Sequence, residues 1–274
     1  MKAFVRNTCM VLTILFQVVV ISHSAQSQPD DRWQSGSSQS LRGEVLTLYC
    51  FTETKANRWT PDEKRVMLQA LQQAQEWLMG QAGNWQVGLQ FEAKDLLGGE
   101  VWEVDDIPTG TGSGAERVDW IRKATQQAGY RNAKNAYQKL SKQYGQSNMH
   151  VLIFAKADGI SYAMRYAHGM NKKKYQLEGV LVYQRYDNGA EMPVPAIIAH
   201  EILHTSGAWD LYATYAQTRE KQAKAMELYP DDIMLRVGHD LNSLKADKLT
   251  AWLVGWNPVE ESQFEWFRPE DFKK

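Results

Sequence analysis

Residues 200–210 read His-Glu-Ile-Leu-His-Thr-Ser-Gly-Ala-Trp-Asp, and the rest of the chain is best understood from this stretch. On a helix, residues four apart stand on the same face, so His200 and His204 can close on one metal ion. Glu201 lies about 100° round the helix from His200. From there its carboxylate can take a proton from a metal-bound water. The spacing therefore indicates the site of a zinc-dependent hydrolase.

The flanking sequence predicts that this stretch lies at the end of a buried helix. Pro193 and Pro195 can only stand at the start of a helix, because proline has no N–H for an interior turn. Residues 196–203 are apolar nearly all round, as in a helix inside a core. Gly207 is the expected left-handed residue after the helix, and its turn lets the chain bring Asp210 back as a third ligand.

Two histidines, one aspartate and an adjacent glutamate suit a catalytic zinc ion. Catalytic zinc sites use three protein ligands and leave a position for water, whereas structural sites are usually four-coordinate and rich in Cys. The alternative without a metal is a buried helix whose histidines only form hydrogen bonds, but such a group needs partners. We therefore predict one catalytic Zn²⁺ held by His200, His204 and Asp210, with Glu201 as the general base.

The pattern His200-Glu201-x-x-His204-x-x-Gly207-x-x-Asp210 resembles the long consensus of metzincin-type zinc peptidases, in the snapalysin-like form in which Asp replaces the third His. The resemblance implies a zincin-like fold. Its active-site helix would lie between an upper subdomain, residues 44–207, and a lower subdomain, residues 208–274. It also implies that Met234, in the sequence Asp-Ile-Met, forms a turn beneath the metal.

The sequence departs from the family after this methionine. In several metzincins a Tyr stands two residues later and helps to hold the transition state, but here that residue is Arg236. Arg236 could stabilise an oxyanion, although a surface role beside Asp231 or Asp232 is the favoured interpretation. Tyr212 is another candidate stabiliser of the transition state, with simple packing at the cleft wall as its alternative.

Two other functions stay open on the sequence alone. Glu220 or Glu227 of a later helix could replace Asp210 as the third ligand, or the domain could have a peptidase-like fold and bind partners without catalysis. The Gly207 turn argues against the first alternative, and the complete set of site residues argues against the second. The favoured prediction is a zinc metalloendopeptidase whose partner is a peptide or protein substrate.

The N-terminal sequence predicts export. A basic start at Lys2 and Arg6, an apolar run and small residues predict a cleaved signal peptide at residues 1–25. The mature protein is then secreted or periplasmic, without stable membrane association. Residues 26–43 are rich in Gln, Ser, Asp and Gly and are expected to be flexible. The catalytic domain is expected to span residues 44–274.

Composition limits the remaining function classes. The 274 residues, 43% hydrophobic and 23% charged, suit one good-sized globular domain or two small ones. Removing the signal peptide leaves 29 of the 31 basic residues against 32 acidic ones, a net charge of −3, which gives no reason to expect nucleic acid as a partner. Cys50 then remains alone, most simply in a core strand; a thiolate that caps the zinc is the alternative.

The order of elements predicts an α/β fold with one mixed sheet covered by helices. Strand 161–166 would form the cleft rim, to which an extended peptide could add. The other expected strands are 44–51, 85–91, 149–154 and 179–183. The expected helices are 61–79, which a capping box at Thr60 opens and Gly80 ends, 115–144 with a break near Gly129, 218–228, and 245–254. No function is assigned to the glycine-rich loop 106–114, Lys172–Lys174, His150 or His239. His168, just past the rim strand, could touch substrate, although an incidental loop His is the favoured interpretation.

Overall fold

The structure is a computed structural model that describes residues 36–38, 41–108, 114–165, 177–191, 194–214, 216–238 and 240–269. The predicted signal peptide, the three consecutive lysines, His168, His239 and most of the glycine-rich loop lie outside the described residues. No helix among the described residues is long and apolar enough to cross a membrane.

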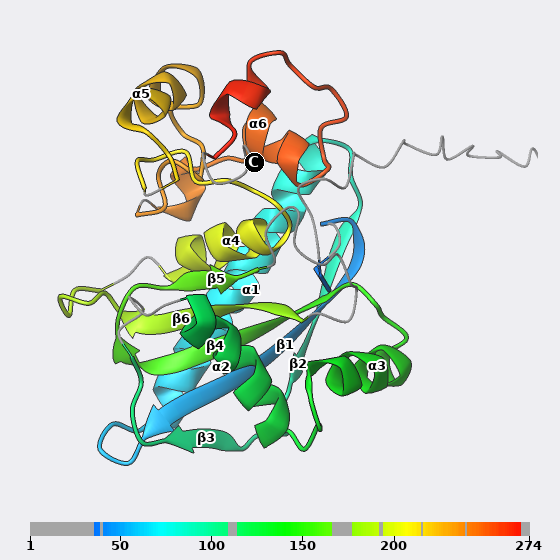
Figure 1. The fold of residues 1–274 in the computed structure, drawn as a ribbon, viewed down its shortest axis with the longest axis vertical. Coiled ribbons are helices and arrows are strands. Elements are labelled where there is room, and N and C mark those ends of the chain that lie inside the picture. Colours follow the sequence, from blue (N-terminus) through cyan, green and yellow to red (C-terminus); the bar gives the residue numbers. More distant parts are fainter. Residues whose placement is uncertain are drawn as a thin grey trace, which may run out of the picture.

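A mostly parallel sheet forms the centre of the molecule (Figure 1). Its strand order is β2-β1-β4-β6-β5, and β3 pairs with β1 beyond the end of β2. All neighbours are parallel except β5, which is antiparallel to β6. The strands are β1 (Gly43–Thr54), β2 (Leu89–Asp95), β3 (Val101–Val104), β4 (Met149–Asp158), β5 (Tyr162–Met164) and β6 (Glu178–Arg185).

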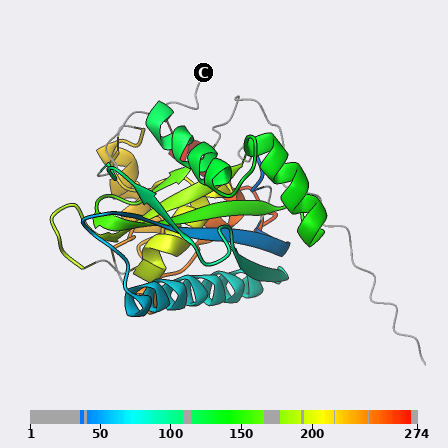
Figure 2. The same cartoon turned by 90° about the horizontal axis from the view of Figure 1, so that it is seen from below.

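Helices cover both faces of this sheet, as Figure 2 shows from below. On one face α1 (Pro61–Asn84) and α4 (Val194–Thr205) share a core with Leu152 and Val180, and on the other α2 (Gly114–Gln127) and α3 (Ala133–Tyr144) pack over Leu48 and Ile153. Parallel strands buried on both faces need apolar residues in nearly every position, which explains the continuous apolar run of β4. The predicted α/β class with a mixed sheet and covering helices is confirmed.

The C-terminal residues pack on the same side as α4. They include α5 (Arg219–Leu228), the short helix η2 (Leu241–Ser243), α6 (Lys248–Leu253) and the short helix η3 (Phe264–Phe267), which Figure 1 draws above α4. Ile233, Trp252 and Phe264 belong to the same hydrophobic core as α1 and α4. One continuous core therefore joins the C-terminal segments to the helix that carries both histidines.

The end of α1 and the start of β2 differ from the prediction. Thr60 forms the expected capping box with Glu63, but the helix passes through Gly80 and ends at Asn84. Ala82 continues the buried face of the helix, so packing of one more turn outweighs the poor helix propensity of glycine. The N–H groups of Trp85 and Val87 then donate to the Ala82 carbonyl, both at 3.0 Å. The predicted strand 85–91 is therefore wrong at its start, because its first residues complete the helix.

Other boundaries follow the prediction more closely. The long helical pattern is broken as expected, and Gly129 has a left-handed φ of +80°. Strands β1, β4 and β6 are each longer than predicted, β5 is shorter, and α6 is shorter than the pattern 245–254 indicated. Strand β3 is an addition, since its four residues are too few to give a periodic signal.

The described part of the segment 26–43 is packed rather than flexible, which corrects the expectation. The Ser37 hydroxyl donates to the Met149 carbonyl at 2.7 Å, and the Ser38 N–H donates to a carboxylate oxygen of Glu178 at 3.1 Å. Leu41 is fully buried and its carbonyl accepts a hydrogen bond from the Trp256 indole. The serine-rich composition suggests exposure, but the Ser37 hydroxyl bonds buried backbone groups and the Ser38 N–H bonds the Glu178 carboxylate instead.

Replacing Gly80 by Ala should stabilise the protein. Gly80 lies inside α1, and no other atom lies within 4 Å of the place that a Cβ atom would take, so Ala gains helix propensity without a clash. We expect the free energy of unfolding in urea to rise by about 0.5–1 kcal/mol. Gly98→Ala is the matched control, because its surroundings are also open but its φ is +65°. That variant should be destabilised; a loss of stability in Gly80→Ala would contradict the assignment of a continuous helix.

His150 should make the fold sensitive to acid. It is fully buried in β4 beside the Thr47 hydroxyl (2.9 Å), and burial lowers its pKa to about 4. In the unfolded chain the His150 ring takes up a proton near pH 6.5, whereas in the folded chain it does so only near pH 4. His150 therefore has no effect on the free energy of unfolding above pH 6.5, and lowers it by up to about 3 kcal/mol as pH drops toward 4. Urea unfolding at several pH values should give a steeper loss for the natural chain than for His150→Gln. Equal slopes over this range would show that His150 takes no part.

Candidate metal centre

Helix α4 places both histidines inside the protein with fixed ring orientations. His200 and His204 are 1% and 7% exposed. Nδ1 of His200 lies 3.1 Å from the Ile233 carbonyl oxygen, and Nδ1 of His204 lies 2.9 Å from that of Ala208. A carbonyl can only accept, so each Nδ1 donates its proton. Both Nε2 atoms are thereby left to face a ligand, which is how metal-binding histidines are held in proteins.

Asp210 meets the two Nε2 atoms. Its Oδ1 lies 3.4 Å from Nε2 of His200 and 3.0 Å from Nε2 of His204. The chain returns to the histidines through Gly207, whose φ of +107° confirms the expected left-handed residue, and whose N–H donates to the His204 carbonyl. Next to Asp210, the Leu211 N–H donates to the Met234 carbonyl at 2.9 Å. The structure thus brings the three predicted ligands together at one point.

This donor set fits a zinc ion. His200, Glu201 and His204 form a buried group whose ligand atoms lie within 4.8 Å of one another and could hold a metal ion. Ligands of a tetrahedral zinc at about 2.0–2.1 Å are roughly 3.3 Å apart. The separations of 3.4 and 3.0 Å between Asp210 and the two histidines match this spacing. Two imidazoles and one carboxylate are the ligands of catalytic zinc sites, which keep a position for water.

Glu201 is buried beside the histidines at 7% exposure. Burial raises the pKa of its carboxyl group, and the nearby Asp210 adds to this effect. The two histidines and a backbone hydrogen bond from Ala163 of β5 act in the opposite direction without cancelling it. A carboxylate with a raised pKa holds a proton more readily near neutral pH, as a general base must.

Opposite charges dominate the rest of the site. Burial alone would lower the pKa of His200, but its hydrogen bond with Asp210 and the charges of Glu201 and Asp210 raise it. Burial alone would raise the pKa of Asp210, but the two histidines hold it well below its usual range. The site therefore keeps an ionised carboxylate facing the two rings, and a divalent cation would be attracted to it.

Tyr212 lines the same centre. Its ring lies nearly parallel to that of His200, at 27° and with the centroids 6.1 Å apart. Burial raises the pKa of the Tyr212 hydroxyl, and the negative charges of Asp210 and Glu201 raise it further. The hydroxyl therefore stays protonated, and it forms a hydrogen bond with Asp210 that raises its pKa as well.

Met234 and Arg236 lie on the turn after α5. Met234 is fully buried in the core that contains α4. Nε of Arg236 donates to the Pro230 carbonyl at 3.1 Å, and Asp231 lies 3.7 Å from the Lys245 amine instead. Arg236 is thus tied back to its own turn, in agreement with a surface role, although its partner is a carbonyl and not an aspartate.

The competing ligands lie elsewhere. Glu227 sits on the surface of α5, paired with Lys224 at 2.9 Å, and Glu220 is exposed in the first turn of that helix. Cys50 faces the core under α2 and α3, on the side of the sheet away from α4, and burial raises the pKa of its thiol. The possible metal-binding group among the described residues consists of His200, Glu201 and His204; it contains neither of these glutamates nor this thiol, and Asp210 joins it only through its contacts with the two histidines.

Three backbone groups of the site were not predicted. The carbonyls of Ile233 and Ala208 orient the two imidazoles, and the backbone of Ala163 forms a hydrogen bond with the Glu201 carboxylate. A backbone group can come from any residue type, so no sequence pattern reveals it. The Asp232 side chain accepts a hydrogen bond from the Met234 N–H at 2.8 Å, and an Asp that binds the N–H two residues on is a turn signal by which the sequence could have indicated it.

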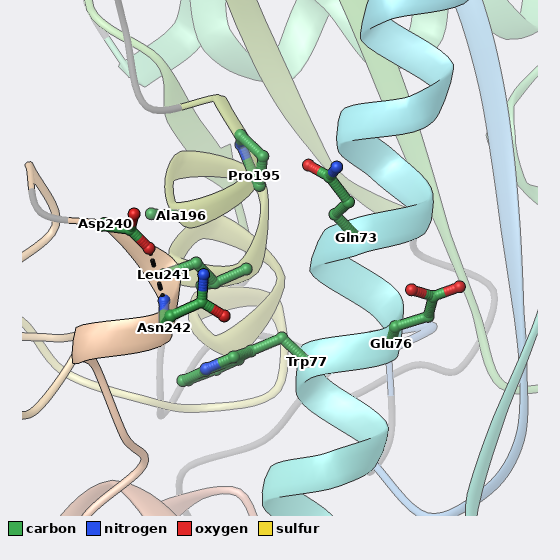
Figure 3. Close-up of a pocket in the computed structure, with 8 residues that line it drawn as sticks. All are labelled: Gln73, Glu76, Trp77, Pro195, Ala196, Asp240, Leu241 and Asn242. Atoms are coloured by element: carbon green, nitrogen blue, oxygen red, sulfur yellow. Dashed lines mark hydrogen bonds between the residues drawn. The ribbon is translucent and has the colours of Figure 1, made fainter.

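A separate pocket of about 500 Å³ lies between α1, the start of α4 and η2 (Figure 3). It reaches α4 one helical turn before His200, at Ala196. The candidate ligands are not among its described lining residues, so it is distinct from the metal centre. It is lined by Gln73, Glu76, Trp77, Pro195, Ala196, Asp240, Leu241 and Asn242.

Comparison with solved structures finds 24 matching chains. The chain is similar to the crystal structure of metalloproteinase-II from Bacteroides fragilis, with 9% sequence identity and a TM-score of 0.36. The match covers 85% of this chain and 60% of that one, so the chain spans less than two thirds of that protein's length. No family model and no curated protein matches the sequence.

Removing the Asp210 carboxylate should remove most of the zinc affinity. We expect Asp210→Ala to bind Zn²⁺ about a hundredfold more weakly or worse, because losing a ligand costs at least as much as losing an outer partner of one. Competition with a chromophoric chelator measures this affinity. Glu227→Ala, which deletes an exposed carboxylate of α5, should bind as the natural chain does. If Glu227→Ala lost zinc affinity and Asp210→Ala kept it, the third ligand would be Glu227 of α5.

Proposed function

We propose that this protein is a secreted zinc-dependent peptidase. The observation that carries the proposal is the convergence of both imidazole Nε2 atoms on the Asp210 carboxylate, with buried Glu201 in the next position of the same helix. His200, His204 and Asp210 would hold the ion. The predicted signal peptide at residues 1–25 supports the secreted location.

The residues divide the chemistry of hydrolysis among them. When bound, zinc lowers the pKa of a coordinated water and polarises the substrate carbonyl. Glu201 takes a proton from the attacking water and passes it to the nitrogen of the leaving amine. Burial raises the pKa of the Glu201 carboxyl group, which makes its carboxylate a stronger base for the first transfer. Tyr212 keeps its proton and donates a hydrogen bond to the oxygen on which negative charge develops.

An extended peptide fits the surroundings of Glu201. Strand β5 is the last strand in the order of the described sheet, and its residue Ala163 is hydrogen-bonded to Glu201. A peptide added to this strand by main-chain hydrogen bonds would run past the general base. Met234, buried in the core that contains α4, would support the two histidines from the C-terminal side, as the resemblance to metzincins implies.

Glu201→Gln should abolish turnover and leave zinc binding intact. Gln cannot accept a proton, so the rate of peptide hydrolysis should fall by about 10²–10⁴-fold, while the zinc content by metal analysis stays near one ion per chain. Digestion of a quenched fluorescent peptide library measures the rate. Glu92→Gln, the same substitution at an exposed residue of β2, serves as the control. Zinc binding without hydrolysis in the natural chain would instead favour a non-catalytic binding domain.

A further inference from the structure

Asp232 sits at the centre of the turn between α5 and α6 and is fully buried. Its Oδ1 accepts hydrogen bonds from the Met234 N–H at 2.8 Å and from the Thr250 hydroxyl at 2.9 Å. Its Oδ2 accepts from the Asp247 N–H at 2.8 Å. One carboxylate therefore joins three groups from two segments, the turn itself and the start of α6.

The turn that Asp232 organises carries the outer partners of the metal centre. The Ile233 carbonyl accepts the proton of His200 Nδ1, and the Met234 carbonyl accepts the N–H of Leu211, next to Asp210. These two carbonyls belong to consecutive residues, so one backbone conformation sets both contacts. An Asp side chain that binds the N–H two residues on is a known way to fix such a turn.

We propose that Asp232 is a positioning residue of the candidate metal centre, which fixes the turn whose carbonyls orient His200 and the segment that carries Asp210. The inference rests on the proposed function for its chemical meaning. The ring orientation of His200 can be measured with or without metal.

The position of Asp232 supports a role beyond general stability. Burial raises its pKa to about 7, so its charged form is costly to keep in the core. The three donors around it match the acceptor capacity of a carboxylate, and an Asn amide would present N–H groups to at least one of them. Substitution by Asn therefore disturbs the turn while it preserves the volume of the side chain.

Asp232→Asn is the main test, with Leu249→Ala as the matched control. Leu249 is fully buried in α6, so its truncation destabilises the same region without touching the hydrogen bonds of the turn. For each variant we would measure three quantities: the urea midpoint of the metal-free protein, the Zn²⁺ affinity by chelator competition, and the visible absorption spectrum with Co²⁺ in place of Zn²⁺.

Asp232→Asn should weaken Zn²⁺ binding by about 10–100-fold, as loss of an outer partner does, and should change the Co²⁺ spectrum. Leu249→Ala should lower the urea midpoint but keep the affinity and the spectrum of the natural chain. Thr250→Val removes only one of the three hydrogen bonds, so it should weaken Zn²⁺ binding less than Asp232→Asn does. If Asp232→Asn does not fold, the same measurements on Thr250→Val test the proposal. Affinity and spectrum unchanged in both turn variants would overturn the proposal.

The ring orientation of His200 gives a readout that needs no metal. Nitrogen-15 spectra of the metal-free natural chain should show His200 with its proton on Nδ1, and this preference should weaken in Asp232→Asn. The His200 resonance can be assigned by comparison with His200→Gln. An unchanged tautomer in Asp232→Asn would contradict the proposal even if no peptide were ever cleaved. If the natural chain did not hydrolyse peptides, the proposed peptidase function would be contradicted, but the role of Asp232 in orienting His200 would not.

Discussion

The structure depends on one electrostatic arrangement, in which two buried imidazoles face a single carboxylate. Burying His200, His204 and Asp210 without partners would cost far more free energy than a small domain can spare. The backbone carbonyls of Ile233 and Ala208 instead accept hydrogen bonds from the two Nδ1 atoms, and the two Nε2 atoms face the Asp210 carboxylate. The lone pairs of the two Nε2 atoms and of the Asp210 carboxylate converge on one point. This is the electrostatic environment that a divalent cation fills, and it explains why so polar a group can lie under a hydrophobic core.

The layers of the fold hold this arrangement rigid. Helix α4 is buried along nearly its whole length between the sheet and the C-terminal segments. Residues on β5 and on the turn after α5 meet α4 from different sides, at Glu201 and His200 respectively. The orientation of each site residue is therefore set by packing of elements that are distant in the sequence. A precise constellation requires such support, because small displacements of catalytic groups are costly.

The sequence allowed the local part of this structure to be predicted well. The capping box at Thr60, the break near Gly129 and the left-handed Gly207 are consequences of residues at fixed short spacings, and each is present. The α/β class followed from the alternation of strand and helix patterns. Predictions failed where tertiary contacts outweighed local preference. Gly80 lies inside a helix because Ala82 beyond it is buried, and Ser37 is held in place because its hydroxyl donates to a buried carbonyl of β4 and accepts from a backbone N–H of β6.

In the candidate site, too, the local features could be predicted and the tertiary contacts could not. Its four chemical side chains occupy eleven consecutive residues, so their spacing could be read as a motif. Their orientation comes from Ile233, from Ala163 and, at the end of α4, from the Ser38 hydroxyl, which lies 3.0 Å from that of Thr205. None of these contacts has a signature in residue type, because backbone carbonyls and N–H groups are common to every residue. A histidine motif therefore identifies the atoms that can bind a metal, whereas the geometry that makes binding strong belongs to segments the motif does not contain.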